Sequence, residues 1–183
     1  QPFRRALSRE MDLFAFVSRQ GLAYYESRPY AAGAARRAVY YLGSRNGGAR
    51  AEPNPERFVL ISCGRAMPVK RIDRIVDALA HLDGVPVDWH HIGDGAELPA
   101  LRARAETALG KKENVRVTFC GRLENAGIAP YYRNVGAHLF LNVSESEGLP
   151  VSIMEALSVG VPAMAANVGG VSEIVTPDTG VLL

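Results

Sequence analysis

Short apolar runs alternate with amphipathic stretches along the chain from Phe58 onward. Each apolar run ends in a turn, and a segment with apolar residues at helical spacing follows it. This alternation is typical of βαβ units, in which parallel strands form a sheet and the connecting helices cover it. We therefore predict an α/β fold with a doubly wound parallel sheet. The predicted strands are 58–63, 87–92, 115–120, 137–143, 162–168 and 180–183, and the predicted helices are 69–82, 97–109, 129–134, 150–159 and 171–175.

The first 42 residues predict only the last part of another α/β unit. They contain two helical stretches and two strands, at 13–17 and 37–42, which are too few for a stable sheet. Residues 43–55 follow with Gly47-Gly48, Pro53, Pro55 and almost no apolar side chains, as is typical of a linker. We expect residues 1–42 to be the tail of a preceding domain, 43–56 a linker, and 57–183 a second domain truncated at its C-terminal end.

Length and charge agree with this division. A chain of 183 residues has room for one α/β domain and part of another. Its net charge of +2 is unevenly spread, because nine arginines against three acidic residues give residues 1–50 a local charge of +6 and leave −4 for residues 51–183. The hydrophobic content of 48% is that of a folded globular protein.

Several classes of protein are disfavoured. No apolar run approaches the roughly 18 residues that cross a bilayer, and charges interrupt the start of the chain where a secretory signal would be apolar. We therefore predict a cytoplasmic protein. Cys63 and Cys120 end strands in the same Cys-Gly-Arg context, and we expect free buried thiols.

The histidines show no metal-ligand spacing, so no metal site is predicted. Tyrosines accompany the basic first part of the chain, but they fit core positions of strands and helices better than a stacking platform for bases. Nucleic-acid binding is therefore disfavoured. These tyrosines are Tyr24, Tyr25, Tyr30, Tyr40 and Tyr41.

The segment 144–162 is the most informative about chemistry. It follows an apolar strand, turns at Gly148, enters a helix at Pro150 and leaves it at Gly160. A loop after a strand of an open parallel sheet lies at the carboxyl edge, where ligands bind. The amides of Gly148 and Leu149 would point outward there and favour an anion such as a diphosphate.

Two carboxylates, Glu147 and Glu155, flank this predicted anion site. A carboxylate does not bind phosphate, so hydroxyl groups of a ribose or a sugar are its natural partners. Together with the anion site they indicate a nucleotide sugar. Spacing alone fits ordinary roles equally well: a solvent-facing helix glutamate for Glu155 and a partner of the helix dipole for Glu147.

Two further loops repeat the design of a strand that ends in glycine and arginine. After Gly64, Arg65 offers a planar fork for phosphate oxygens and Lys70 a compact charge. Alternatively, Lys70 and Arg71 are surface charges that open a helix, where the helix dipole makes cations mildly unfavourable. The loop at 119–123 could receive a nucleotide base near Leu123. The turn at 93–95 has leucine at position 98, so it lacks the dinucleotide fingerprint of an NAD-dependent oxidoreductase.

Taken together, these motifs resemble the group 1, or family 4, retaining glycosyltransferases of GT-B fold, over roughly residues 12–183. The paired-glutamate motif with its Gly-Leu-Pro sequence is the most specific part of this resemblance. Its sequence is most similar to that of enzymes of bacterial surface-polysaccharide synthesis. The motifs are Gly64-Arg65 with Lys70, Gly93-Asp94-Gly95, the segment 119–123, Glu147 to Pro150 with Glu155, and Gly169-Gly170 with Glu173.

The resemblance implies two facing Rossmann-like domains, of which the C-terminal one holds a nucleoside-diphosphate sugar. It assigns Gly64 to the donor site, Arg65 and Lys70 to the diphosphate, Glu155 to the ribose and Glu147 to the donor sugar. It assigns the amides of Gly148 and Leu149 to phosphate or sugar, and Leu123 to the base. The implied reaction transfers the sugar to an acceptor hydroxyl with retention of configuration, and needs no cofactor and no metal.

The sequence departs from the family pattern chiefly in what it lacks. The acceptor pocket of the N-terminal domain is represented only by its last elements, so we expect a donor-binding half that is not a competent transferase. Arg71 also stands where a small residue often follows the lysine. The alternatives are a non-catalytic nucleotide-sugar-binding module and a nucleotide-sugar 2-epimerase of the same fold.

The acceptor implied by the resemblance is a saccharide or a lipid-linked one, bound by the missing domain. The basic residues 1–50 support a further hypothesis, peripheral contact with the inner face of the cell membrane, to which each cation near an anionic surface would contribute about 1 kcal/mol. A solvated or interdomain surface is the preferred interpretation of this charge.

Overall fold

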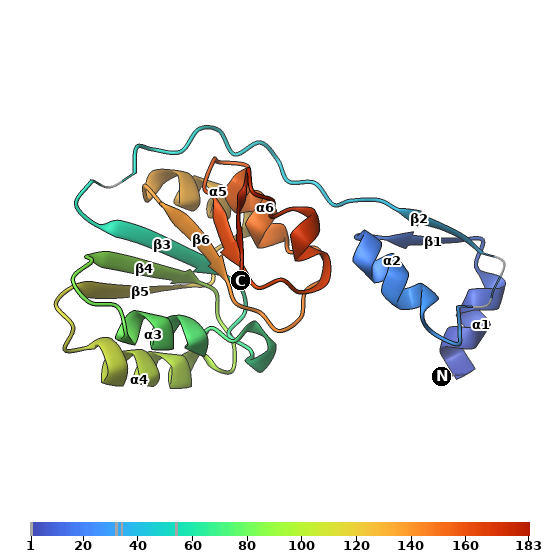
Figure 1. Cartoon of the computed structure of the whole chain (residues 1–183), viewed down its shortest axis with the longest axis horizontal. Coiled ribbons are helices and arrows are strands. Elements are labelled where there is room, and N and C mark those ends of the chain that lie inside the picture. Colours follow the sequence, from blue (N-terminus) through green and yellow to red (C-terminus); the bar gives the residue numbers. More distant parts are fainter. Residues whose placement is uncertain (1, 32, 34, 54) are drawn as a thin grey trace.

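The chain forms two units of unequal size joined by a long extended segment (Figure 1). The computed structural model describes residues 2–31, 33, 35–53 and 55–183. Residues 1, 32, 34 and 54, which fall in the predicted first segment and linker, lie outside the described residues. Within the described part, the strands form a two-stranded and a six-stranded sheet, both parallel. The predicted α/β fold is confirmed.

The larger sheet has the strand order β5-β4-β3-β6-β7-β8. The chain starts in the middle of this sheet at β3, adds β4 and β5 on one side, and then crosses over to add β6, β7 and β8 on the other. This reversal makes β3 and β6 the neighbours at which ligands bind in open parallel sheets. The strands are β3 (Phe58–Cys63), β4 (Val87–Ile92), β5 (Val115–Gly121), β6 (Leu139–Asn142), β7 (Ala163–Ala165) and β8 (Gly180–Leu182).

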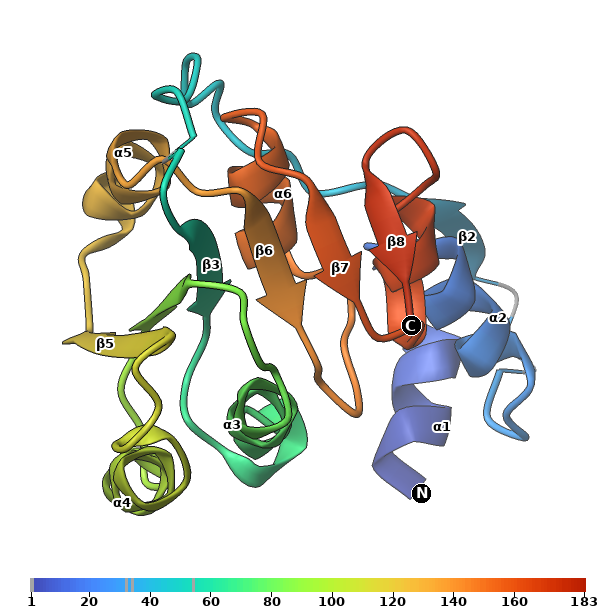
Figure 2. The ribbon, with the colours of Figure 1, turned by 60° about the vertical axis from the view of Figure 1, so that its left-hand side comes forward.

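Helices cover both faces of this sheet (Figure 2). Helices α3 (Asp73–Ala80) and α4 (Leu98–Leu109) lie on one face, whereas α5 (Asn125–Asn134) and α6 (Val151–Leu157) lie on the other. Two short 3-10 turns, η1 (Pro68–Lys70) and η2 (Gly169–Glu173), complete the loops after β3 and β7.

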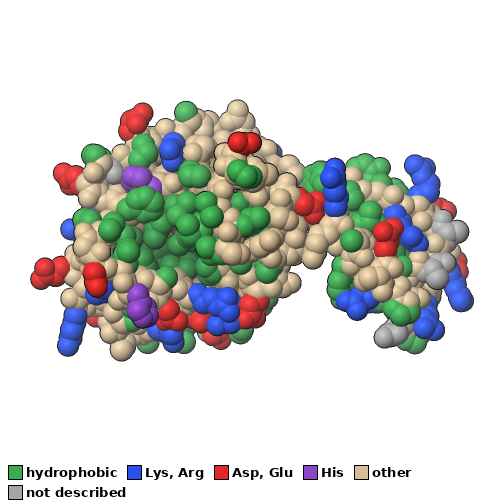
Figure 3. Space-filling model, viewed as in Figure 1, with side chains coloured by type: hydrophobic (Ala, Val, Ile, Leu, Met, Phe, Trp, Pro, Cys, Tyr) green, Lys and Arg blue, Asp and Glu red, His purple; other side chains and the backbone are tan. Residues whose placement is uncertain are grey.

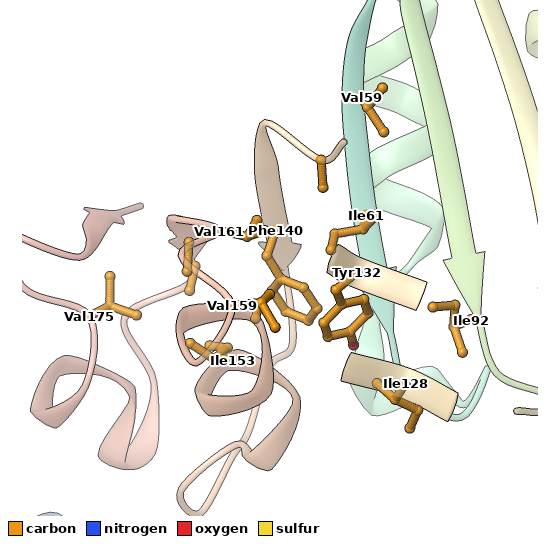
Figure 4. Packing of buried hydrophobic residues seen from close by; sticks show 14 of the residues in the cluster. Val59, Ile61, Ile92, Ile128, Tyr132, Phe140, Ile153, Val159, Val161 and Val175 are labelled. Carbon is orange, nitrogen blue, oxygen red and sulfur yellow. The ribbon is translucent and has the colours of Figure 1, made fainter. Parts of the chain in front are cut away.

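Successive residues of β3 serve the two faces in turn, as the strand period of two requires. Leu60 packs with α3 and α4, while Val59 and Ile61 pack with α5 and α6. Figure 4 shows the second of these clusters, in which the rings of Tyr132 and Phe140 lie edge to face with centroids 5.8 Å apart. Both side chains are fully buried, so this cluster is a closed core.

Two predicted helices begin at other residues in the structure. Helix 69–82 is interrupted, because Arg71 adopts a left-handed conformation with φ of 47° and the Val69 carbonyl accepts a hydrogen bond from Glu145 N instead of a helical amide. Helix 129–134 begins earlier, at Asn125, and contains Pro130. Burial of Ile128 and Tyr132 holds that helix against the sheet despite the proline.

The other differences are in length. The predicted strands 137–143 and 162–168 are shorter, and residues 169–173 form a 3-10 turn in place of the predicted helix 171–175. The predicted strand 37–42 is observed at Arg36–Val39. Cys63 and Cys120 are free and only partly buried, against the expectation of buried thiols.

The smaller unit comprises α1 (Pro2–Glu10), β1 (Leu13–Phe16), α2 (Arg19–Glu26) and β2 (Arg36–Val39). Tyr25 packs with Phe14 and Phe16, at centroid distances of 5.1 and 5.2 Å, and with Tyr30. The prediction that all five tyrosines occupy core positions is wrong for three of them, because this unit has too few elements to cover them. The exposed tyrosines are Tyr24, Tyr40 and Tyr41.

The described residues between β2 and β3 form no helix or strand, but several of them hydrogen-bond to the larger unit. Ser44 donates to the Met154 carbonyl, Gly47 N to the Ser158 carbonyl, and Ala51 N to the Arg133 carbonyl. The segment therefore lies along the outer side of α5 and α6, as Figure 1 shows. These hydrogen bonds hold the described part of the segment against the larger unit.

Candidate functional site

The carboxyl ends of β3, β4 and β5 surround an open pocket of about 450 Å³. Because these strands are parallel, the loops that follow them meet at one edge of the sheet. Gly93 lets two of the loops approach closely: its φ is 142°, and a Cβ atom there would lie 2.0 Å from the Gly64 carbonyl oxygen. The pocket is lined by Cys63, Gly64, Arg65, Ile92, Gly93, Asp94, Arg122, Leu123 and Ile128.

Arg65 brings positive charge to this pocket. Its side chain is exposed, and it forms no hydrogen bond or ion pair with any residue that the structure describes. Arg122, on the opposite loop, is also exposed and has no such partner in the described chain. A guanidinium without a carboxylate partner keeps all five of its donors for a ligand. The pocket is therefore suited to an anion.

Lys70 and Glu147 form an ion pair across the loops that follow β3 and β6. Lys70 Nζ lies 2.8 Å from Glu147 Oε1, and Asn142 Nδ2 donates to the same oxygen at 3.0 Å. Burial raises the pKa of Glu147, but the hydrogen bonds from Lys70, Ser144 and Asn142 outweigh burial and lower the pKa below its ordinary value. Glu147 is thus a carboxylate at neutral pH.

Gly148 and Leu149 connect Glu147 to α6. Their amides donate no hydrogen bond to any described residue, while the Gly148 carbonyl accepts one from Gly170 N at 2.8 Å. Gly169 also lies against this loop, where its Cβ atom would come within 1.8 Å of the Glu147 carbonyl oxygen. Gly169 and Gly170 therefore pack against this loop, and the amides of Gly148 and Leu149 remain available to a ligand.

Glu155 lies in the middle of α6. It is half-buried, and burial raises its pKa above the ordinary value of a glutamate. Its negative charge also acts on Cys63, raising the pKa of that thiol together with the larger effect of burial. Glu155 is therefore less exposed than an ordinary solvent-facing glutamate.

The sequence-predicted residues thus fall into two adjoining groups. Gly64, Arg65 and Leu123 line the pocket, and Lys70 pairs with Glu147 beside it. Gly148, Leu149 and Glu155 follow on the loop and helix that begin at Glu147. Each of them lies in a loop or helix that follows the carboxyl end of β3, β5 or β6.

A second pocket, of about 510 Å³, lies between η1, α3 and α4. Its two cations are already neutralised: Arg71 pairs with Asp73 and Glu145, and Arg104 with Asp77 at 2.6 Å. It is larger than the pocket at the ends of β3, β4 and β5, but it offers no unpaired positive charge in the described chain. It is therefore the weaker candidate for an anionic ligand.

Sequence reasoning missed three contributors. In the sequence, Asn142, which holds Glu147, is only a polar residue within an apolar run. His91 was considered only as a metal ligand, whereas the structure buries it behind the site. Glu173 was noted beside the glycine pair, but nothing local indicated that its carboxylate would accept hydrogen bonds from Arg19 N and Gln20 N, at the start of α2.

Among the residues that the structure describes, no helix is long and apolar enough to span a membrane. No group of three or more histidine, cysteine, aspartate or glutamate side chains among them is arranged to hold a metal ion.

The family model for group 1 glycosyl transferases matches residues 49–183. The chain belongs to this family. The match covers the whole larger unit, including every predicted site residue, which confirms the resemblance noted in the sequence.

Relatives among characterised proteins match the same region. The chain is 31% identical over 129 residues to a GDP-mannose-dependent alpha-(1-6)-phosphatidylinositol dimannoside mannosyltransferase of Mycobacterium tuberculosis, covering 69% of this chain and 32% of that protein. It is 33% identical over 131 residues to the lipopolysaccharide core biosynthesis mannosyltransferase LpsB of Rhizobium meliloti, covering 66% and 35%. The chain therefore spans about a third of the length of these curated relatives.

Solved structures extend the likeness to nearly the whole chain. Sucrose-phosphate synthase from Thermosynechococcus elongatus superposes with a TM-score of 0.80 at 22% identity, covering 98% of this chain and 47% of that one. Anabaena Alr3699/HepE in complex with UDP-glucose gives 0.75 at 24% identity, covering 97% and 51%. At such identities the likeness shows the fold alone, which is that of GT-B glycosyltransferases.

Proposed function

We propose that the chain carries the donor site of an enzyme that transfers a sugar from a nucleoside-diphosphate sugar to an acceptor hydroxyl with retention of anomeric configuration. The observation that carries this proposal is the guanidinium of Arg65, which has no partner among the described residues, at a pocket of about 450 Å³ beside the Lys70–Glu147 pair. A cation and a carboxylate side by side fit a ligand that is anionic at one end and rich in hydroxyl groups at the other.

The two cations would carry the electrostatic part of the reaction. As the bond between the sugar and the diphosphate breaks, negative charge grows on the leaving diphosphate, and fixed positive groups stabilise that charge. Arg65 can approach phosphate oxygens with two parallel donors. Lys70 has three donors, so it can keep Glu147 and still donate to the diphosphate.

Glu147 would orient the sugar. The bonds from Lys70 and Asn142 both end on Oε1, and a carboxylate has about four lone-pair sites in all. Acceptor capacity therefore remains for sugar hydroxyls. The lowered pKa keeps the group charged, and that charge would also stabilise positive character at the anomeric carbon.

The remaining site residues would bind the nucleotide. We assign Glu155 to the ribose, the amides of Gly148 and Leu149 to phosphate or sugar, and the backbone near Leu123 to the base. Two relatives support a nucleotide-sugar donor: the mycobacterial mannosyltransferase is described as GDP-mannose-dependent, and the Anabaena protein binds UDP-glucose. They differ in the base, so the donor base of this chain is left to experiment.

We further propose that residues 1–42 are the tail of the acceptor-side domain and 57–183 the donor domain. Because the acceptor would bind the preceding domain, we expect this chain by itself to bind the donor without transferring it. Cell-surface glycans are the proposed class of product, since one relative is described as a phosphatidylinositol dimannoside mannosyltransferase and the other as an enzyme of lipopolysaccharide core biosynthesis.

Calorimetric titration of the chain with UDP, GDP and ADP tests the site. One of the three should bind, and Arg65→Ala should weaken it roughly 10- to 100-fold, since hydrogen bonds to charged groups contribute about 1.5–3 kcal/mol. Glu155→Ala should weaken it less. Arg116→Ala, an exposed arginine on β5 away from the pocket, is the matched control and should bind as wild type does. Binding of none of the three, or equal binding by all variants, would overturn the site assignment.

Glycosyl transfer by the parent enzyme separates catalysis from binding. If transfer occurs and Glu147→Ala abolishes it while nucleotide binding persists, the chain is part of a transferase. A parent protein that binds the nucleotide sugar but never transfers it is a non-catalytic module. Conversion of the nucleotide sugar without any acceptor would identify the 2-epimerase.

Peripheral membrane contact by the parent enzyme is a separate proposal. It is supported by α1, which exposes Phe3 and Leu7 beside the basic side chains of Arg4, Arg5 and Arg9. Sedimentation with anionic vesicles should carry the parent enzyme down, and an enzyme left in the supernatant would contradict the proposal.

A further inference from the structure

A chain of buried polar groups lies behind the candidate site, on the face of the sheet that α3 and α4 cover. Trp89 Nε1 donates to Ser62 Oγ at 3.0 Å, and Ser62 Oγ lies 2.9 Å from His91 Nδ1. Trp89 and His91 are fully buried, and Ser62 is 4% exposed. None of these three residues has a role in the proposed reaction.

The hydrogen-bond pattern decides which imidazole nitrogen of His91 carries the proton. An indole N–H only donates, so Ser62 Oγ accepts from Trp89 and keeps its own proton to give. Among the described residues, the acceptor for that proton is His91 Nδ1. Burial lowers the pKa of His91 to about 4, so the ring is neutral at physiological pH. The single ring proton must therefore lie on Nε2.

His91 Nε2 is thus a buried donor, and it has no hydrogen-bond partner among the described residues. Leaving such a donor unpaired in a protein interior is unfavourable. His91 also lines a small cavity of about 20 Å³, together with Lys70, Asn142 and Ser144. A cavity needs about 10–15 Å³ and two to four polar neighbours to hold one water molecule, and this cavity has both.

We propose that one water molecule binds in this cavity, accepts a hydrogen bond from His91 Nε2 and donates to Asn142 Oδ1. Asn142 Oδ1 already accepts a bond from Ser144 N at 3.1 Å and has a second lone pair. Asn142 Nδ2 donates to Glu147 Oε1. The water therefore links His91 to the side chain that holds Glu147.

This link makes His91 a positioning residue. With its oxygen held by Ser144 N and by the water, the Asn142 amide cannot turn, and its nitrogen stays directed at Glu147. Groups behind a ligand-binding side chain orient it in this way at many sites. The consequence for donor binding rests on the proposed function, whereas the water and the His91 tautomer do not.

Nitrogen NMR of the wild-type chain tests the first step without any variant or nucleotide. The His91 resonances should show the proton on Nε2 throughout the neutral range, and Nε2–H should give a cross-peak to a long-lived water. A proton on Nδ1, or no contact with water, would overturn the proposal.

His91→Phe tests the link to Glu147, with His90→Phe as the matched control. His90 is the preceding residue of β4, bonds to Tyr131 at 2.6 Å and does not line the cavity. Carboxyl carbon titration should place the pKa of Glu147 higher in His91→Phe than in wild type, and unchanged in His90→Phe. An unchanged value in a folded His91→Phe chain would contradict the link.

Ser62→Ala covers the case in which His91→Phe does not fold. It removes the partner of Nδ1 and leaves the proposed water as the partner of the ring, so the proton should stay on Nε2 and keep its cross-peak to the water; a proton that moves to Nδ1, or a lost cross-peak, would contradict the proposal. Where a nucleoside diphosphate binds wild type, His91→Phe should weaken it about tenfold, the lower end of losses from such supporting groups. If none binds but the NMR results hold, the proposed function fails and the water site stands.

Discussion

The two units of the chain bury their apolar side chains to very different degrees. In the larger unit both faces of the sheet are covered, and Trp89, Tyr132 and Phe140 are fully buried. In the smaller unit Phe3 is 73% exposed, and Leu13 and Tyr40 are also exposed. Figure 3 shows that the smaller unit carries apolar and basic side chains together on its visible face. A parallel sheet needs cover on both faces, which two strands and two helices cannot supply.

The smaller unit instead contacts the larger one at η2. Glu173 of η2 accepts hydrogen bonds from Arg19 N at 2.9 Å, Gln20 N at 3.0 Å and Tyr41 Oη at 2.8 Å. Ser18, the N-cap residue of α2, lies against Gly170. The start of α2 is therefore docked beside the loop that carries Glu147. The larger unit is thus stabilised by its own core, whereas the smaller unit is stabilised by its contact with η2.

Truncation of a core ring should have the largest effect. Phe140→Ala removes a fully buried side chain that packs on Tyr132, as Figure 4 shows, and should lower the free energy of unfolding by about 3–5 kcal/mol. Phe3→Ala, its counterpart in the smaller unit, should change it by less than about 0.5 kcal/mol. Urea denaturation measures both, and equal losses would contradict the difference between the units.

Adding a side chain at the contact between the units should have the second-largest effect on stability. A Cβ atom at Gly170 would lie 2.6 Å from the Gly148 carbonyl oxygen and 2.7 Å from Ser18 Cβ, so Gly170→Ala should displace the start of α2 at a cost of about 1–3 kcal/mol. Gly148→Ala is the control, because its Cβ atom would make an ordinary contact of 3.9 Å with Val17. Thermal unfolding should therefore separate the two variants, and equal midpoints would contradict this account.

Removing the docking carboxylate should release the smaller unit alone. Glu173→Ala deprives two amides of α2 of their acceptor, a loss of about 1 kcal/mol by analogy with helix caps. Hydrogen exchange should quicken in residues 19–26 and stay unchanged in β3 and β4. Ser172→Ala, an exposed neighbour, should leave both regions as in wild type. Protection of α2 that survives Glu173→Ala would show that the unit is held elsewhere.

Lowering the pH should weaken the contact between Glu173 and α2. We expect this effect to be smaller than those of the three substitutions above. Partial burial raises the pKa of Glu173, but the bonds from Gln20, Arg19 and Tyr41 outweigh it and the pKa lies below its ordinary value. A folded pKa below the unfolded value of about 4.3 means that the stabilisation is complete above that pH and is lost as the pH falls through the folded pKa. Exchange in α2 should therefore be constant, after correction for intrinsic rates, from neutral pH to about 5 and quicken below 4. Glu173→Ala should abolish this step.

Much of the larger unit could be predicted because its information is local. The strands at 58–63 and 87–92 have their predicted bounds, since an apolar run between turns is a property of consecutive residues. The loops at Arg65, Leu123 and Glu147 were placed at one sheet edge by the rule that parallel strands end together. The break at Arg71 was not predicted, because it depends on a bond from Glu145 to Val69, far along the chain.

The sequence by itself determined the α/β alternation, the family and the identity of the charged residues near the site. Only the tertiary structure decided how those charges are partnered: Lys70 with Glu147, 77 residues away, and Glu173 with the backbone amide of Arg19, 154 residues away, while Arg65 has no partner among the described residues. The physical reason is that periodicity reports which face of an element is buried, whereas an ion pair depends on the positions of two distant loops. A cation that is free for a ligand and one that already holds a carboxylate are identical in the sequence.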